Sequence, residues 1–126
     1  MRLVIGSVVL IILFLIFASY ITNQTLEFIN YARLELDEIR ELMLADQWPE
    51  AQEQVLSLLK AWNQAQDYWD LYILHEDIEN VEVTLARLVS YIRSQDLSSG
   101  LAELAQLDMH FSHIYRNEMF NLQNIL

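Results

Sequence analysis

A run of nineteen residues without a charged side chain extends from Leu3 to Ile21. As a helix rising 1.5 Å per residue it would be about 28 Å long, close to the roughly 30 Å hydrocarbon thickness of a bilayer. A cleaved signal peptide would have a shorter apolar core of about 7–15 residues and a small-x-small cleavage site. A cut after Ser19 would instead place the bulky Phe17 at the first small position. We therefore predict that residues 1–22 form an uncleaved transmembrane anchor.

Positive charges near the two ends of this run set its predicted orientation. Arg2 directly precedes the apolar run, whereas Arg33 follows it only after about a dozen residues. Arginine and lysine close to a span favour the cytoplasmic side. We expect a single-pass protein of the cell membrane, with a cytoplasmic N-terminus and with residues 23–126 outside the cytoplasm. The bilayer is then contacted through the N-terminal helix.

The charge of the remaining chain restricts its partners. Beyond Arg2, the chain carries 18 acidic and six basic side chains, a net charge of −12. Such a charge repels nucleic acids and anionic polymers. Nucleic acid is therefore excluded as a partner, and a basic protein is favoured. The chain has no cysteine, which excludes disulfides, zinc knuckles and thiol nucleophiles.

Beyond the anchor, apolar residues recur at steps of three and four, and Gly100 and Pro49 are the only glycine and proline. This recurrence is typical of helices that bury one apolar stripe. The four series run from Ile29 to Met43, from Ala51 to Ala65, from Leu71 to Ile92 and from Leu101 to Ile114. Short connections make successive helices antiparallel. The sequence therefore predicts an all-α fold, an antiparallel bundle of four helices in two hairpins.

Helix ends are predicted from capping residues. Asp46 can cap the second helix, and Pro49 suits the first turn of a helix. Asp67 and Asp70 mark a less definite junction, where one kinked helix is an alternative to two separate helices. The segment Asp96–Gly100 forms the third connection.

Two further features of the predicted fold concern its ends and its repeats. A short C-terminal helix, capped by Asn117, is predicted from Glu118 to Leu126. The polar residues Thr22–Thr25 do not break helices, so the first bundle helix could be continuous with the anchor. The two hairpins also suggest tetratricopeptide-like pairs, although the 34-residue period of that repeat is absent.

Histidines and acids suggest one candidate metal site. The stretch from His75 to Glu79 resembles the metalloprotease pattern HExxH, but Glu79 replaces the second histidine. If the third and fourth helices are antiparallel, His110 and His113 could approach His75. A divalent-metal site of His75, Glu79, His110 and His113 is therefore one hypothesis. The favoured interpretation is a solvated helix face, because these side chains flank the apolar stripe.

No catalytic set accompanies these residues. Ser57 and Lys60 have the Ser-x-x-Lys spacing of penicillin-binding proteins, but the other two motifs of that class are missing. No glycine-rich phosphate loop is present either. We predict a protein that is not an enzyme, with no catalytic residue and no cofactor.

An acidic ridge and a group of aromatic residues are candidates for partner binding. Glu76, Glu79 and Glu82 would form the ridge, and Trp48 could join the contact. Most of the aromatic group is expected to pack in the core. Its members are Trp48, Trp62, Tyr68, Trp69 and Tyr72.

Several of these residues together resemble one protein family. They are the N-terminal anchor, Asp46-Gln47-Trp48 with Ala51, Trp62 and Trp69, His75-Glu76, Thr84 to Leu88, Tyr91-Ile92 and Leu122 to Leu126. The chain resembles domain-of-unknown-function family 4363, small uncharacterised single-pass membrane proteins of Gram-positive, spore-forming bacteria. The resemblance covers nearly the whole chain and implies no known activity.

The sequence thus favours a membrane-anchored protein of unknown biochemical activity, acting as a protein-interaction or scaffold module outside the cytoplasm. Its expected partner is another membrane or envelope protein, with a basic surface. The alternative is a divalent-metal-binding or sensing domain that uses His75, His110 and His113.

Overall fold

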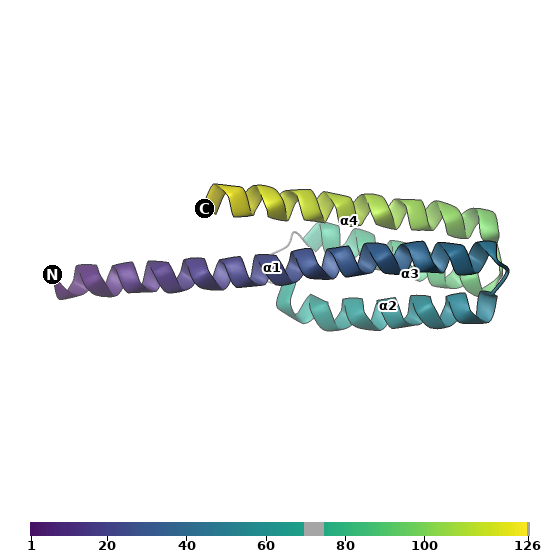
Figure 1. The fold of residues 1–126 in the computed structure, drawn as a ribbon, viewed down its shortest axis with the longest axis horizontal. Helices are drawn as coiled ribbons and strands as arrows, with labels where there is room; N and C mark the ends of the chain where they lie inside the picture. The colour runs from purple at the N-terminus through teal and green to yellow at the C-terminus, as the bar shows by residue number, and fades with distance from the viewer. Residues whose placement is uncertain (70–74, 126) are drawn as a thin grey trace.

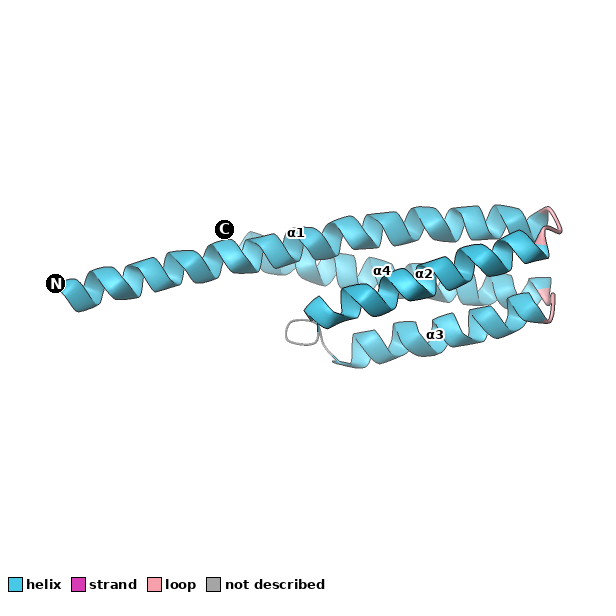
Figure 2. Cartoon of the chain, turned by 90° about the horizontal axis from the view of Figure 1, so that it is seen from below, coloured by secondary structure: helices cyan, strands magenta, loops and turns pink. Residues whose placement is uncertain are grey.

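The computed structural model describes residues 1–69 and 75–125, which form four helices (Figure 1). These are α1 (Arg2–Leu44), α2 (Trp48–Trp69), α3 (His75–Arg93) and α4 (Leu97–Ile125). The described residues contain no strand (Figure 2). The prediction of an all-α fold with four helices is confirmed.

The four helices form a closed antiparallel bundle. Both α1 and α3 pack against α2 and against α4. The turns that join α1 to α2 and α3 to α4 lie at the same end of the bundle (Figure 2). Because α4 returns to α1, the two hairpins close on one another around a shared core. This arrangement differs from tetratricopeptide repeats, in which helical pairs stack as an open array.

Helix α1 is one uninterrupted helix of 43 residues, which corresponds to about 64 Å. All side chains from Met1 to Phe17 are exposed, and Ala18 is the first buried residue. The first part of α1 is the one helical stretch in the described residues that is long and apolar enough to cross a membrane. The apolar run and the first bundle helix are therefore continuous, and the predicted boundary at residue 22 lies inside α1.

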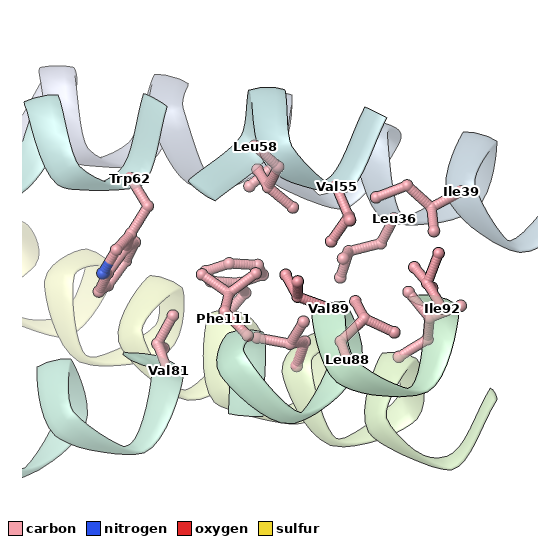
Figure 3. Packing of buried hydrophobic residues seen from close by; sticks show 14 of the residues in the cluster. Leu36, Ile39, Val55, Leu58, Trp62, Val81, Leu88, Val89, Ile92 and Phe111 are labelled. Atoms are coloured by element: carbon pink, nitrogen blue, oxygen red, sulfur yellow. The ribbon is translucent and has the colours of Figure 1, made fainter. Parts of the chain in front are cut away.

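The predicted apolar stripes form the core (Figure 3). At its centre, the ring of Trp62 on α2 lies 6.2 Å from Phe28 on α1 and 6.1 Å from Phe111 on α4, measured between centroids. Leu58 and Leu88 lie next to this group and are fully buried. The aromatic residues thus join three helices, as the core-packing interpretation of Trp62 predicted.

The two turns at the far end of the bundle have the same backbone structure. Asp46 and Gln95 adopt left-handed conformations, with φ of 60° and 55°. The next residue in each turn donates its N–H to a carbonyl five residues back, Gln47 to Leu42 and Asp96 to Tyr91. This is the Schellman arrangement, which satisfies the last carbonyls of a helix.

The prediction that Asp46 caps α2 is wrong. Its left-handed backbone places it at the end of α1, where its carboxylate accepts a hydrogen bond of 2.8 Å from the Trp48 indole. In the second turn, Asp96 does cap the following helix, because its carboxylate accepts the Ser99 N–H at 3.2 Å. The residue after the left-handed one is in the position to cap the next helix. In the second turn it is Asp96, and in the first turn it is Gln47.

The predicted separate helix from Glu118 is the last part of α4. Asn117 does not cap it and instead lies 3.2 Å from the His113 ring, Nδ2 to Nε2. The helix continues because Ile114 and Glu118 extend the buried stripe of α4 against α1.

Helices α2 and α3 are separate and pack against each other, so the alternative of one kinked helix is wrong. The proposed cap Asp70, with Leu71 and Tyr72, lies outside the described residues.

Candidate functional site

The first predicted ligand pair lies at the start of α3. His75 Nε2 lies 3.1 Å from Glu79 Oε1, one helical turn away, and both side chains are exposed. The pair therefore stays on the surface of α3.

The histidines of α4 contact other residues of α3 and α4. His113 Nε2 lies 3.6 Å from Asp77 Oδ1, and Asp77 is half-buried between the helices. Burial lowers the pKa of His110. The neighbouring carboxylate of Asp77 acts in the opposite direction, and the positive charge of His113 acts in the same direction as burial. A neutral His110 is thus favoured in the folded state.

These contacts do not make a metal centre. Across residues 1–69 and 75–125, no group of three or more His, Asp or Glu side chains has an arrangement that could hold a metal ion. The pairs His75–Glu79 and His113–Asp77 are two separate side-chain contacts. The structure brings together His113 and Asp77, a residue that the sequence did not single out as a ligand. Its position four residues before the buried Val81, on the same face of α3, was the signal that it lies beside a neighbouring helix.

The predicted partner-binding residues are divided between surface and core. Glu76 and Glu79 are exposed on α3, whereas Glu82 accepts a hydrogen bond from Gln66 of α2. Trp48 is buried, and its indole N–H is bound by Asp46. Trp48 therefore stabilises the turn between α1 and α2 and is not a surface contact.

A more extensive acidic surface lies between α1 and α2. It is hollowed into a shallow, open groove of about 900 Å³. Its acidic residues come from both helices, and they are Asp37, Glu38, Glu41, Glu50 and Glu53. Leu42 and Ser57 also line it. We call this feature the acidic groove; Arg40 is the cation beside it, in contact with Asp37 at 3.2 Å.

One amide holds the two helices together along this groove. Gln54 of α2 donates hydrogen bonds to both Glu35 and Glu38 of α1, at 2.9 Å for Glu38. Burial raises the pKa of Glu35, and the nearby carboxylate of Glu38 raises it further, while the Gln54 hydrogen bond lowers it in part. The carboxylates along the groove thus repel one another, and the hydrogen bonds from Gln54 partly offset this repulsion.

Replacing Gln54 by glutamate is expected to lower the free energy of unfolding by about 1 kcal/mol at pH 7, because two donated hydrogen bonds become contacts between like charges. The loss should diminish at acidic pH, because the carboxyl group of Glu35, whose pKa is raised, takes up its proton there. Urea unfolding of the full chain in detergent, followed by its helical circular dichroism, measures both effects. The matched control is Gln64→Glu, on the exposed face of the same helix. Equal losses in the two variants would contradict the role assigned to Gln54.

The sequence did contain a signal for the acidic groove. Its acids lie at similar distances on either side of the turn around Asp46, from Asp37 to Glu41 and from Glu50 to Glu53. An antiparallel hairpin brings such positions side by side. The ridge on α3 was more conspicuous because its acids are contiguous with a histidine.

A second polar feature lies where α4 runs beside α1 at the end of its apolar run. Glu118 is 3 % exposed, and its carboxyl group is hydrogen-bonded to Thr22. Its Oε2 atom has no hydrogen-bond partner among the described residues. Burial raises the pKa of Glu118 to about 7, although the Thr22 hydrogen bond acts in the opposite direction.

Comparison with known proteins identifies a family for this chain. A family model described as "Domain of unknown function (DUF4363)" matches residues 16–125. No curated protein and no solved structure matches the chain significantly. The matched region includes the end of the apolar run, the rest of α1, and all of α2, α3 and α4.

Proposed function

Since this chain belongs to the family described as domain of unknown function DUF4363, whose description assigns no activity, we propose a role from the structure itself. The protein is a membrane-anchored interaction module that presents an acidic groove to a basic segment of a neighbouring membrane or envelope protein. Residues 1–22 serve as the anchor, and residues 23–126 serve as the bundle outside the cytoplasm.

The exposed first part of α1 supports the anchor. Its side chains up to Phe17 are all exposed, and they are almost entirely apolar. Exposing so large an apolar surface to water is unfavourable, and a bilayer removes it from water. Arg2 before the run and the acidic bundle after it support the proposed orientation.

The position of the acidic groove carries the proposal. Glu41 follows Ile21 by twenty residues on the continuous helix α1, so it is held about 30 Å beyond the end of the apolar run. This distance exceeds the Debye length of about 8 Å at physiological salt, so lipid charges act little on the groove. The groove therefore faces proteins at that height above the membrane.

Charge and shape indicate the chemistry of the partner. Five carboxylates line the groove, and Arg40 compensates only one of them directly. Lysine or arginine side chains of a partner would relieve the repulsion among these acids. Leu42 in the groove and the exposed Leu44 at its end offer apolar contacts to the same segment.

Site-specific crosslinking in intact cells tests this function. A photo-reactive amino acid at Ser57, in the groove, should form an adduct with a protein whose contacting segment is rich in lysine or arginine. The control position is Ser90, an exposed serine on α3. The adduct should decrease when Glu41, Glu50 and Glu53 are changed to glutamine. An adduct that survives this neutralisation, or that forms equally from Ser90, would contradict the proposal.

A further inference from the structure

The alignment of α1 with α4 follows from two contacts between them. Arg33 Nε of α1 lies 3.1 Å from Asp108 Oδ1 of α4, and Thr22 is hydrogen-bonded to Glu118. Antiparallel helices advance by the same 1.5 Å per residue in opposite directions. Phe120 therefore lies level with Tyr20, and the end of α4 at Ile125 lies level with about residue 15 of α1.

Helix α4 thus continues alongside the apolar run of α1. In Figure 1, the C-terminal end of α4 extends further towards the N-terminus of the chain than α2 and α3 do. The seven residues after Glu118 correspond to about 10 Å of helix. The apolar run is only nineteen residues long, so a bilayer of about 30 Å needs nearly all of it, including residues 15–21. Residues 119–125 of α4, which lie beside residues 15–21 of α1, therefore lie at the same depth.

This part of α4 combines four apolar residues with three Asn or Gln side chains, a composition that suits the boundary between hydrocarbon and headgroups. Charged residues occur along α4 up to Arg116 and Glu118, and none follows from Met119 to Ile125. Phe120 is 64 % exposed on α4, and Tyr20 is 61 % exposed on α1. Aromatic side chains at one level are typical of the boundary between hydrocarbon and headgroups.

The contact between the two helices also has the character of a membrane contact. Ala18 and Thr22, four residues apart on α1, are both buried. Small residues at this spacing let helix backbones approach closely within a bilayer. The Thr25 hydroxyl is satisfied inside its own helix, by the carbonyl of Ile21 at 3.0 Å.

We propose that residues 119–125 of α4 enter the leaflet that faces the bundle, beside the anchor, with Phe120 in contact with lipid. This inference rests on the proposed membrane anchor. The segment is about 10 Å long, so it reaches only the outer part of a leaflet about 15 Å thick. The bundle is then attached to the membrane at two points, which fixes its tilt and the direction of the acidic groove.

Because the chain has no cysteine, single cysteine variants of the full chain test the depth of each position. Phe120→Cys, Tyr20→Cys, Met109→Cys and Leu34→Cys each carry an environment-sensitive fluorophore in phosphatidylcholine vesicles. All four positions are exposed, so the bundle should fold in each variant. Quenching by doxyl groups on the upper acyl chains reports contact with lipid, and quenching by iodide reports contact with water.

The expected result is that the fluorophores at positions 120 and 20 lose most of their emission to the doxyl lipids, to a similar extent. Those at positions 109 and 34 should lose theirs to iodide alone. A fluorophore at 120 that iodide quenches, or that neither agent reaches because protein covers it, overturns the inference while position 20 still supports the anchor. If position 20 also escapes the doxyl lipids, the membrane anchor itself is wrong.

Discussion

Replacing Trp62 by alanine is expected to lower the free energy of unfolding of the bundle by about 3–5 kcal/mol. Trp62 is fully buried, and its ring contacts Phe28 on α1 and Phe111 on α4. Removing it leaves a cavity between three helices, which the rigid backbone around it can fill only in part. Urea unfolding of the full chain in detergent, followed by helical circular dichroism, measures the loss.

The size of this loss depends on the central position of the ring, and a control variant shows this. Val83 is 52 % exposed on α3, and Val83→Ala should change the free energy of unfolding by less than about 0.5 kcal/mol. Trp62→Phe keeps an aromatic ring and should lose less than Trp62→Ala. A loss below about 1 kcal/mol for Trp62→Ala would mean that the core described by Figure 3 is not the stabilising one.

Changing Glu118 to glutamine is expected to raise the free energy of unfolding at pH 8 by about 2–3 kcal/mol and to leave it nearly unchanged at pH 4. Glutamine has nearly the same shape and can still bond to Thr22, but it carries no charge to desolvate. The effect therefore isolates the cost of ionising a buried carboxyl group.

The pH dependence follows from the two states of this carboxyl group. In the unfolded chain it ionises near the ordinary glutamate pKa of 4.5, whereas in the folded chain its pKa is about 7. Between these values the unfolded state has already lost the proton that the folded state retains, so the free energy of unfolding falls as the pH rises. Above the folded pKa the loss is complete and constant. Glu118→Gln should lack this decline.

A matched variant shows whether the decline belongs to Glu118. Glu53→Gln removes an exposed acid of α2 and should keep the wild-type fall in stability between pH 4.5 and 7. Unfolding curves of the three proteins at pH 4, 6 and 8 provide the comparison. If Glu118→Gln shows the same decline as the wild type, ionisation of Glu118 is not its source.

Sequence reasoning found the core because burial repeats along a helix. Ile29, Leu58, Leu88 and Phe111 lie in the predicted stripes and are all fully buried. It failed at Asp46, because the same residue types are common at two positions. One is the cap at the start of a helix, and the other is the left-handed residue that ends the preceding helix. The difference depends on backbone torsion, which a short stretch of sequence does not determine.

The candidate site was harder to predict than the core. The acids of α1 and α2 lie on either side of one turn, and they line one groove because the turn at Asp46 pairs their helices in a particular register. The predicted metal ligands, in contrast, contact residues other than those that the sequence paired with them. His75 and His113 lie on neighbouring helices, but Asp77 occupies the position facing His113, and His75 points to Glu79.

The sequence alone determined the properties that depend on local pattern and on total charge. These are the apolar run of membrane length, the four helices, their buried stripes and the acidic character of the bundle, because periodicity and composition act within a few turns of helix. Only the tertiary structure decided that α1 continues from the apolar run into the bundle, and that α4 extends back beside it to place Glu118 against Thr22. Such contacts depend on the register between helices, which is set by how side chains distant in sequence fit together.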